Sequence, residues 1–203
     1  MADEVDELLE TIKEKQYTNL VFDFDETLTI LNVPWREWLE SVMAALPQNK
    51  RAEIKKILNG RQAPWDAVVN EHIKFDDDFY KQFLKICLDF ETKYFNHTPY
   101  HTLVKSLPDL KAAGRSLYLW TNNMRLTAER GLLELGIAQL FTKIVSREDV
   151  RLGKPDPEGW ALIKQDTEPL SSYLFIGDSD NDKQAAAHAG IDYFRIRYFK
   201  NSA

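Results

Sequence analysis

A short apolar run that ends in two carboxylates, residues 20–25, constrains the fold of this chain more than any other feature. Residues 20–22 have the composition of a short strand that is buried on both faces, which is typical of a parallel sheet. Asp23 and Asp25 follow directly. Because open parallel sheets bind ligands at the carboxyl ends of their strands, the two acids are predicted to lie where reactive groups are useful.

Asp23 and Asp25 are also predicted to repel each other, since alternate residues of an extended chain lie on one side. At about 4 Å and an effective dielectric constant of about 20, the repulsion is about 4 kcal/mol, enough to raise a pKa or to require a cation. The alternative is that one acid caps a following helix while the other is solvated. Three further polar stretches favour a reactive pair.

Composition and charge exclude several classes of protein. A chain of 203 residues with 44% hydrophobic residues can form one core and a smaller subdomain. A net charge of −6 gives no basic surface, so no nucleic-acid partner is expected. The single cysteine, Cys87, excludes an internal disulfide, and any metal is expected to have oxygen ligands. No long apolar run or apolar leader is present, so we expect a cytoplasmic protein without a membrane partner, either a monomer or a weak dimer.

The hydrophobic pattern predicts an α/β fold. An amphipathic surface helix is expected before the first strand, at residues 5–12. Beyond residue 98, helical patterns that end near glycines alternate with short apolar runs. The expected strands are residues 116–120, 143–145, 173–176 and 193–196. This alternation predicts a doubly wound, Rossmann-like parallel sheet with right-handed crossovers.

Residues 32–97 interrupt this alternation, because they contain helical spacing and no strand pattern. Four apolar stripes are present, near Trp35, Ile54, Trp65 and Phe83. We therefore expect an inserted all-helical cap at residues 32–97 and a Rossmann-like core made of residues 1–31 and 98–203. The tryptophans of these stripes are expected to form the cap core, with the alternative that a tryptophan edge faces a substrate; they are Trp35, Trp38 and Trp65.

Polar residues follow the core strands, as Asp23 and Asp25 follow the first one. Thr121 and Asn122 come after the second expected strand, Lys154 lies in a loop, and an acidic run covers residues 177–182. Acids, a hydroxyl and a lysine at one sheet edge suit phosphoryl transfer, which needs a nucleophile and positive charge. A carboxylate such as Asp23 can accept the phosphoryl group, and Asp25 is placed to protonate the leaving alcohol and then to activate water.

These stretches occur in the order used by the haloacid dehalogenase superfamily, which the chain resembles over nearly its whole length. The stretches are residues 23–27, Thr121, residues 153–157 and residues 177–182. By this resemblance Asp23 is the nucleophile, Asp25 the general acid and base, and Thr121 and Lys154 hold the phosphate. Asp178 binds Mg²⁺ together with the Asp23 side chain and the Asp25 carbonyl, and Asp182 supports the metal. Asn122 and Arg125 are further candidates for contacts with the substrate.

Two residues depart from the family pattern, and several have a plainer interpretation. Glu26 stands where many members have glycine, so a tighter or differently directed loop after the nucleophile is expected. Trp120 is bulkier than usual, so a narrower pocket is expected. Lys154 is alternatively a solvated loop lysine, and Asp180 or Asp182 a helix cap. No catalytic role is expected for the histidines, which are His72, His97, His101 and His188.

The sequence therefore predicts a Mg²⁺-dependent phosphatase that acts on a small-molecule phosphate ester and has a cap that closes over the site. One rival is a phosphomutase of the same family, similar to beta-phosphoglucomutase, which returns the phosphoryl group to a sugar. The other rival is a non-catalytic module that binds phosphate for regulation.

Overall fold

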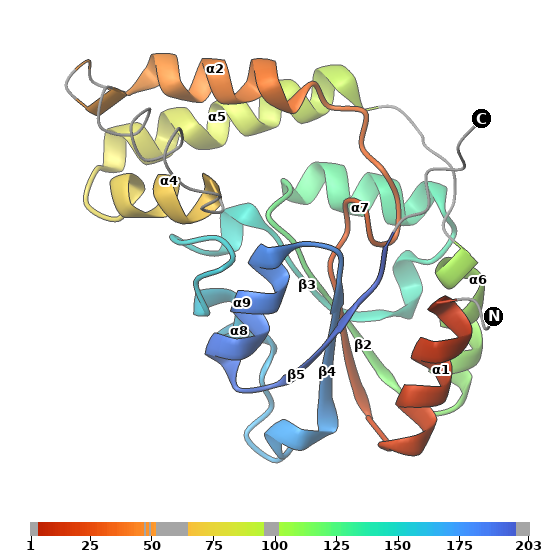
Figure 1. Cartoon of the computed structure of the whole chain (residues 1–203). Helices are drawn as coiled ribbons and strands as arrows, with labels where there is room; N and C mark the ends of the chain where they lie inside the picture. The colour runs from red at the N-terminus through yellow and green to blue at the C-terminus, as the bar shows by residue number, and fades with distance from the viewer. Residues whose placement is uncertain (1–3, 47, 49, 52–64, 96–101, 198–203) are drawn as a thin grey trace.

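The structure is a computed structural model that describes residues 4–46, 48, 50–51, 65–95 and 102–197. One parallel sheet has the strand order β3-β2-β1-β4-β5 (Figure 1). The strands are β1 (Asn19–Phe22), β2 (Ser116–Trp120), β3 (Phe141–Val145), β4 (Tyr173–Gly177) and β5 (Asp192–Arg195). The chain winds outward from β1 in both directions, which confirms the predicted doubly wound sheet. It also places the end of β1 at the point where the strand order reverses, the usual ligand site of such sheets.

Helices cover both faces of the sheet, because successive residues of each strand point to opposite sides. Leu20 and Phe22 pack with α1, α6 and α7, whereas Val21 packs with α8 and α9. The bounds of the core helices are α1 (Glu4–Glu14), α6 (Thr102–Ala112), α7 (Arg125–Glu134), α8 (Glu158–Ile163) and α9 (Asp180–Ala189), with short 3-10 turns at η1 (Ala138–Leu140), η2 (Arg147–Asp149) and η3 (Leu170–Ser172). The strands are thus buried on both faces, as their apolar composition predicts.

The predicted glycine ends of the helices are confirmed. Gly190 closes α9 with a φ of 72°, and Gly136 follows α7 with a φ of 70°. This left-handed conformation favours glycine, which has no Cβ to clash with the backbone. Among the described residues, no helix has both the length and the apolar character needed to cross a membrane.

A separate layer of helices lies above the carboxyl ends of the strands (Figure 1). It consists of α2 (Trp35–Ala45), α4 (Trp65–Ile73) and α5 (Asp77–Tyr94). Pro34 precedes α2 as predicted, and the Asp76 side chain caps α5 by accepting a hydrogen bond from the Phe79 N–H at 2.8 Å. The predicted helix near Ile54 and the boundary at residue 97 lie outside the described residues. The division into a core and a cap at these positions therefore stays a proposal.

The helical layer has its own apolar cluster, which contains Trp38, Val42, Phe83 and Cys87. Met124, which follows β2, packs into the same cluster. The layer is consequently held against the core by apolar contact as well as by hydrogen bonds, so a cavity between the two has walls from both.

Candidate active site

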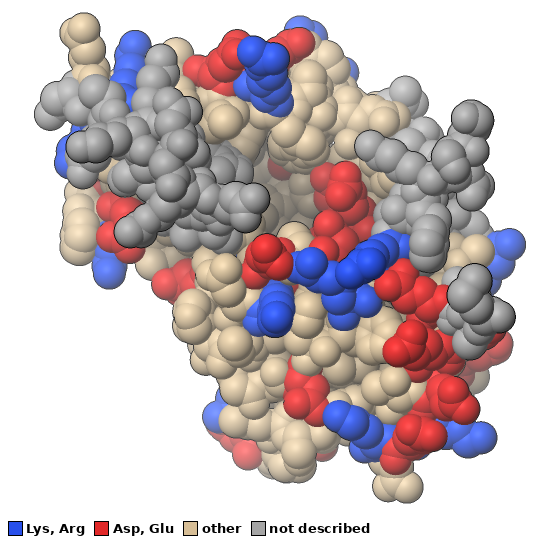
Figure 2. Space-filling view, in the orientation of Figure 1, with Lys and Arg blue, Asp and Glu red and all other residues tan. Residues whose placement is uncertain are grey.

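A cavity of about 310 Å³ lies between the carboxyl ends of the strands and the helical layer. Figure 2 shows acidic side chains in a hollow on this face of the molecule. The residues that line the cavity are Asp23, Asp25, Glu26, Trp35, Trp38, Asp66, Phe83, Cys87, Glu91, Asn122, Asn123, Lys154, Asp178, Ser179, Asn181 and Asp182. The structure thus brings four predicted acids together with Lys154, and they are Asp23, Asp25, Asp178 and Asp182.

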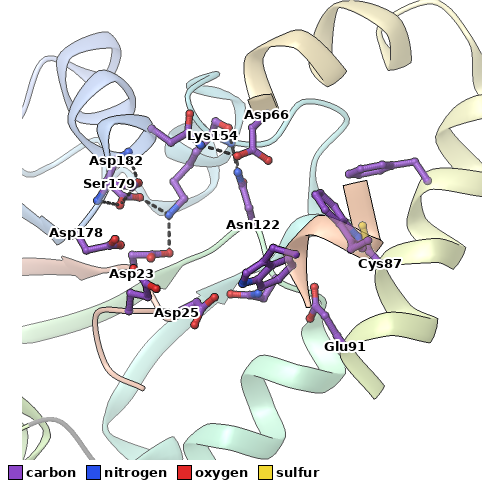
Figure 3. A pocket seen from close by; sticks show the side chains of 16 residues that line it. Asp23, Asp25, Asp66, Cys87, Glu91, Asn122, Lys154, Asp178, Ser179 and Asp182 are labelled. Atoms are coloured by element: carbon purple, nitrogen blue, oxygen red, sulfur yellow. Dashed lines mark hydrogen bonds and ion pairs between the residues drawn. The ribbon is translucent and has the colours of Figure 1, made fainter. Parts of the chain in front are cut away.

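Lys154 is the centre of this group (Figure 3). Its Nζ donates to Asp23 Oδ1 at 2.6 Å and to Asp182 Oδ1 at 2.5 Å. All three residues are buried, with Lys154 only 2% exposed. Burial alone lowers the pKa of Lys154, but the charges of Asp182 and Asp23 raise it above its ordinary value. Lys154 is therefore a charged ammonium inside the protein, not a solvated loop lysine.

Asp23, Asp178 and Asp182 form a possible metal site, because each offers a carboxylate oxygen and these oxygens lie within 4.8 Å of one another. Burial raises the pKa of Asp23 to about 7, although Lys154 lowers it, and burial with repulsion from Asp23 raises the pKa of Asp178 to about 8. Burial is the larger cause of both shifts, and repulsion between the neighbouring acids adds to it. Hard oxygen ligands and surplus negative charge fit a divalent cation such as Mg²⁺.

Asp182 has two functions, because its oxygens have different partners. One oxygen binds Lys154, and the other accepts hydrogen bonds from the Ser179 N–H at 3.0 Å and from the Ser179 hydroxyl at 2.6 Å. Ser179 in turn caps α9 by accepting from the Asp182 N–H. Capping was the alternative interpretation for Asp180 or Asp182, and the structure places Asp182 in the capping box of α9. The same capping box fixes the orientation of the oxygen that faces Lys154.

Asp25 points into the cavity beside Asp23, where the Leu31 N–H donates to its Oδ1 at 2.7 Å. Burial is the main reason that the pKa of Asp25 rises to about 8, with Asp23 adding to the effect. The next residue, Glu26, has a φ of 57°. This left-handed conformation costs a non-glycine residue about 1 kcal/mol, which explains in physical terms why glycine is suited to the position.

Two asparagines hold the main chain of the Lys154 loop. The Asn122 amide accepts from the Lys154 N–H at 2.8 Å and donates to the Lys154 carbonyl at 2.9 Å. Asn70, on α4, makes the same pair of contacts with Gly153, donating to its carbonyl at 2.6 Å and accepting from its N–H at 3.2 Å. Asn122 is predicted to bind substrate, but its amide is used to position Lys154.

Thr121 and Arg125 do not reach the cavity wall. The Thr121 hydroxyl donates to Asn123 Oδ1 at 2.8 Å and accepts from the Asn123 N–H at 3.0 Å, within its own loop. Arg125 forms ion pairs with Glu129 and Asp149 on the surface. The substrate contact predicted for Arg125 is therefore not part of the arrangement seen here, because nearby carboxylates already bind its guanidinium.

Trp120 does not narrow the pocket either, which corrects the expectation from the sequence. It is 1% exposed and its ring stacks on that of Phe175, with the ring centroids 5.3 Å apart. A Cβ at Gly159 would lie 2.3 Å from the indole nitrogen of Trp120. The extra size of Trp120 is thus accommodated by a glycine in α8, beneath the sheet and away from the cavity.

Two acids of the helical layer, Asp66 and Glu91, line the cavity although the sequence did not single them out. Glu91 is 2% exposed and accepts from the Met124 N–H at 2.9 Å, and burial raises its pKa to about 7. Burial also raises the pKa of Asp66 to about 6, while the Asn181 amide donates to its Oδ2 at 2.5 Å. Glu91 stands four residues after Cys87 in a buried stripe, a spacing that is detectable in the sequence.

Comparison with known proteins agrees with this architecture. Residues 20–196 match the family described as haloacid dehalogenase-like hydrolase. A pyrophosphatase of Bacillus velezensis is 36% identical over 105 residues, covering 47% of this chain and 48% of the relative. A phosphoglycolate phosphatase of Salmonella choleraesuis is 28% identical over 155 residues, and the match covers 76% of this chain and 60% of the relative. The chain thus spans about half to three fifths of the length of these relatives.

A solved structure, described as a predicted phosphoglycolate phosphatase from Haemophilus somnus, shares the fold with a TM-score of 0.55. It is 22% identical in sequence, and the match covers 88% of this chain and 84% of that one. The family match extends over nearly all of the sheet and the helical layer, including every loop that contributes to the acid and lysine cluster. The chain therefore belongs to the haloacid dehalogenase-like hydrolase family.

Proposed function

We propose that this protein is a Mg²⁺-dependent phosphatase, which hydrolyses a small phosphate ester through an aspartyl phosphate on Asp23. The observation that carries the proposal is the buried Lys154 ammonium between Asp23 and Asp182, next to Asp178. A nucleophilic carboxylate, a fixed positive charge and hard metal ligands are the groups that phosphoryl transfer requires. The names of the curated relatives, a pyrophosphatase and a phosphoglycolate phosphatase, support phosphoryl chemistry.

In this proposal Asp23 attacks phosphorus and Lys154 offsets the negative charge of the phosphate oxygens. Mg²⁺ held by Asp23, Asp178 and Asp182 would supply further positive charge when bound. With its pKa raised to about 8, Asp25 is protonated near neutral pH and can give its proton to the leaving oxygen. It then accepts a proton from the water that splits the aspartyl phosphate. We also assign a phosphate contact to the Thr121 hydroxyl, which would have to turn away from Asn123 and toward the cavity by rotation about one bond.

The test is the release of phosphate from an aryl phosphate, with Mg²⁺ and with EDTA. We expect activity only with Mg²⁺, and a loss of at least about a thousandfold in kcat for Asp23→Asn. Asp180→Asn is the matched control, because Asp180 lies in the same acidic run but its side chain is 72% exposed and outside the cavity. No release from any of a panel of phosphate esters, or full activity of Asp23→Asn, would contradict the proposal.

Hydrolysis and mutase chemistry differ in the final acceptor of the phosphoryl group. With water labelled by heavy oxygen, hydrolysis places the label in free phosphate. A mutase instead transfers the phosphoryl group to a second hydroxyl of a sugar phosphate and releases little phosphate. We expect the label in phosphate; transfer to a sugar hydroxyl would replace the phosphatase proposal with the mutase.

A further inference from the structure

Part of the cavity wall is aromatic and comes from the helical layer. Trp35 and Trp38 come from α2 and Phe83 from α5. The rings of Trp35 and Trp38 meet edge to face with centroids 5.5 Å apart, and Trp38 meets Phe83 at 6.2 Å. A leaving group that extends from the phosphate toward the helical layer would therefore contact aromatic rings, which attract cations through their electron-rich faces.

Hydrogen-bond acceptors accompany these rings. Asp66 and Glu91 enter from the helical layer, on the side of the cavity away from Asp178 (Figure 3). Asn181 donates its amide to Asp66, whereas its buried Oδ1 has no hydrogen-bond partner among the residues that the structure describes. A buried acceptor without a donor is costly in a protein unless a ligand supplies one. The wall therefore suits a ligand group that carries N–H donors.

The charge of the cavity points in the same direction. Its wall contains seven carboxylates, which are Asp23, Asp25, Glu26, Asp66, Glu91, Asp178 and Asp182. Of the described residues that line it, Lys154 is the one cation, and Asp23 and Asp182 already bind it. A carboxylate on the leaving group would be repelled by Asp66, whereas an ammonium would be attracted.

We propose that the alcohol part of the substrate carries a protonated amine, so that the substrate class is a small aminoalkyl phosphate. The ammonium would donate to Asp66 and lie against the rings of Trp35 and Trp38. This inference rests on the proposed phosphatase function and narrows its substrate. It separates the chain from a relative named for phosphoglycolate, whose leaving group carries a carboxylate.

Three esters of similar size test the proposal on the unmodified protein: 2-aminoethyl phosphate, 2-hydroxyethyl phosphate and phosphoglycolate. Their distal groups are positive, neutral and negative at neutral pH. We expect kcat/KM with Mg²⁺ to be at least about tenfold higher for the amine than for the neutral ester, and lowest for phosphoglycolate. Equal values, or a preference for phosphoglycolate, would overturn the inference.

A substitution then assigns the preference to a residue. Asp66→Asn removes the charge with little change of shape, so we expect the ratio of kcat/KM between amine and neutral ester to fall at least about fivefold. Asp89→Asn is the control, because Asp89 lies on α5 with its side chain 58% exposed and pairs with Lys85 on the surface. The control should leave the ratio unchanged, and an unchanged ratio in Asp66→Asn would refute the assignment.

The outcomes separate this inference from the proposed function. If neither the three esters nor a generic aryl phosphate is hydrolysed, the phosphatase proposal itself fails. If the esters are hydrolysed at similar rates or in the reverse order, the phosphatase stands and only the aminoalkyl class is wrong. The charge series on the unmodified protein decides this even if Asp66→Asn does not fold.

Discussion

Glu91 shows how burial changes the chemistry of a single side chain. Its carboxyl is almost fully enclosed, and burial raises its pKa from 4.5 to about 7 even though Thr127, Met124 and Asn123 donate to it. The folded protein therefore holds a proton on Glu91 at a pH at which the unfolded chain has released it. In this pH window the folded state binds more protons than the unfolded state, so stability falls as the pH rises.

The free energy of unfolding of the wild type should accordingly fall, relative to that of Glu91→Gln, between pH 4 and pH 8. A pKa change from 4.5 to about 7 corresponds to about 3 kcal/mol, because each pH unit is about 1.4 kcal/mol. Urea unfolding at a series of pH values measures the difference, and other titrating groups cancel between the two proteins. Glu71→Gln, at an exposed position of α4, is the control. Parallel curves for wild type and Glu91→Gln would contradict the assigned burial effect.

Residues were predictable from the sequence when the reason for their position is local. Asp23, Asp25 and Lys154 stand in loops whose composition departs sharply from the apolar strands near them, so the chain itself shows where they lie. Asp66 and Glu91 sit on amphipathic helices, where an acid usually belongs to a solvated face. Only the packing of α4 and α5 over the sheet shows that these two acids enter the cavity.

At the scale of elements, α4 and the loop after β2 hold the Lys154 loop from two sides. Asn70 binds both main-chain polar groups of Gly153, and Asn122 binds both of Lys154. Asn70 belongs to the helical layer and Asn122 to the core, so the position of Lys154 depends on both layers being in place. We infer that docking of α4 helps to aim the ammonium at Asp23.

Replacing Asn70 with alanine should therefore lower kcat by about tenfold and change KM less, because the Lys154 loop loses one of its two supports. The freed Gly153 groups should also lower the free energy of unfolding by about 1–3 kcal/mol. Steady-state kinetics on an aryl phosphate and urea unfolding measure the two effects. Gln82→Ala removes an exposed amide from α5 and should change neither. Wild-type kcat in Asn70→Ala would show that α4 does not position Lys154.

The core elements were predictable because each has a clear period and a clear end. The apolar strands and the glycine-terminated helices agree with the structure to within a few residues. How the helical layer lies over the site was not predictable, since an apolar stripe reveals which face is buried but not against which neighbour. Trp120 illustrates the same limit, because its size was evident while the side of the sheet that it faces was not.

At the scale of the whole molecule, loops from distant parts of the chain hold three carboxylates together at the edge of the sheet. Their mutual repulsion opposes folding unless Lys154 and a cation balance it. A ligand that binds only the folded state stabilises it by about 2.7 kcal/mol when present at a hundred times its Kd. Mg²⁺ should therefore raise the Tm, and EDTA should reverse the increase.

Thermal unfolding of Asp178→Asn tests whether this stabilisation comes from the proposed metal site. The variant should lose most of the Mg²⁺-dependent rise in Tm, because Asp178 is one of the three proposed oxygen ligands. Asp180→Asn, which changes the neighbouring exposed acid, should keep it. An equal rise in both variants would mean that Mg²⁺ binds elsewhere.

The central claim is that Asp23 receives the phosphoryl group, and a rapid acid quench during turnover tests it most directly. Mass analysis of peptides from the quenched protein should find one phosphoryl group on the peptide that contains Asp23, and none when Mg²⁺ is withheld. Continued turnover with no phosphorylated Asp23 at any quench time, together with unchanged turnover by Asp23→Asn, would contradict the account.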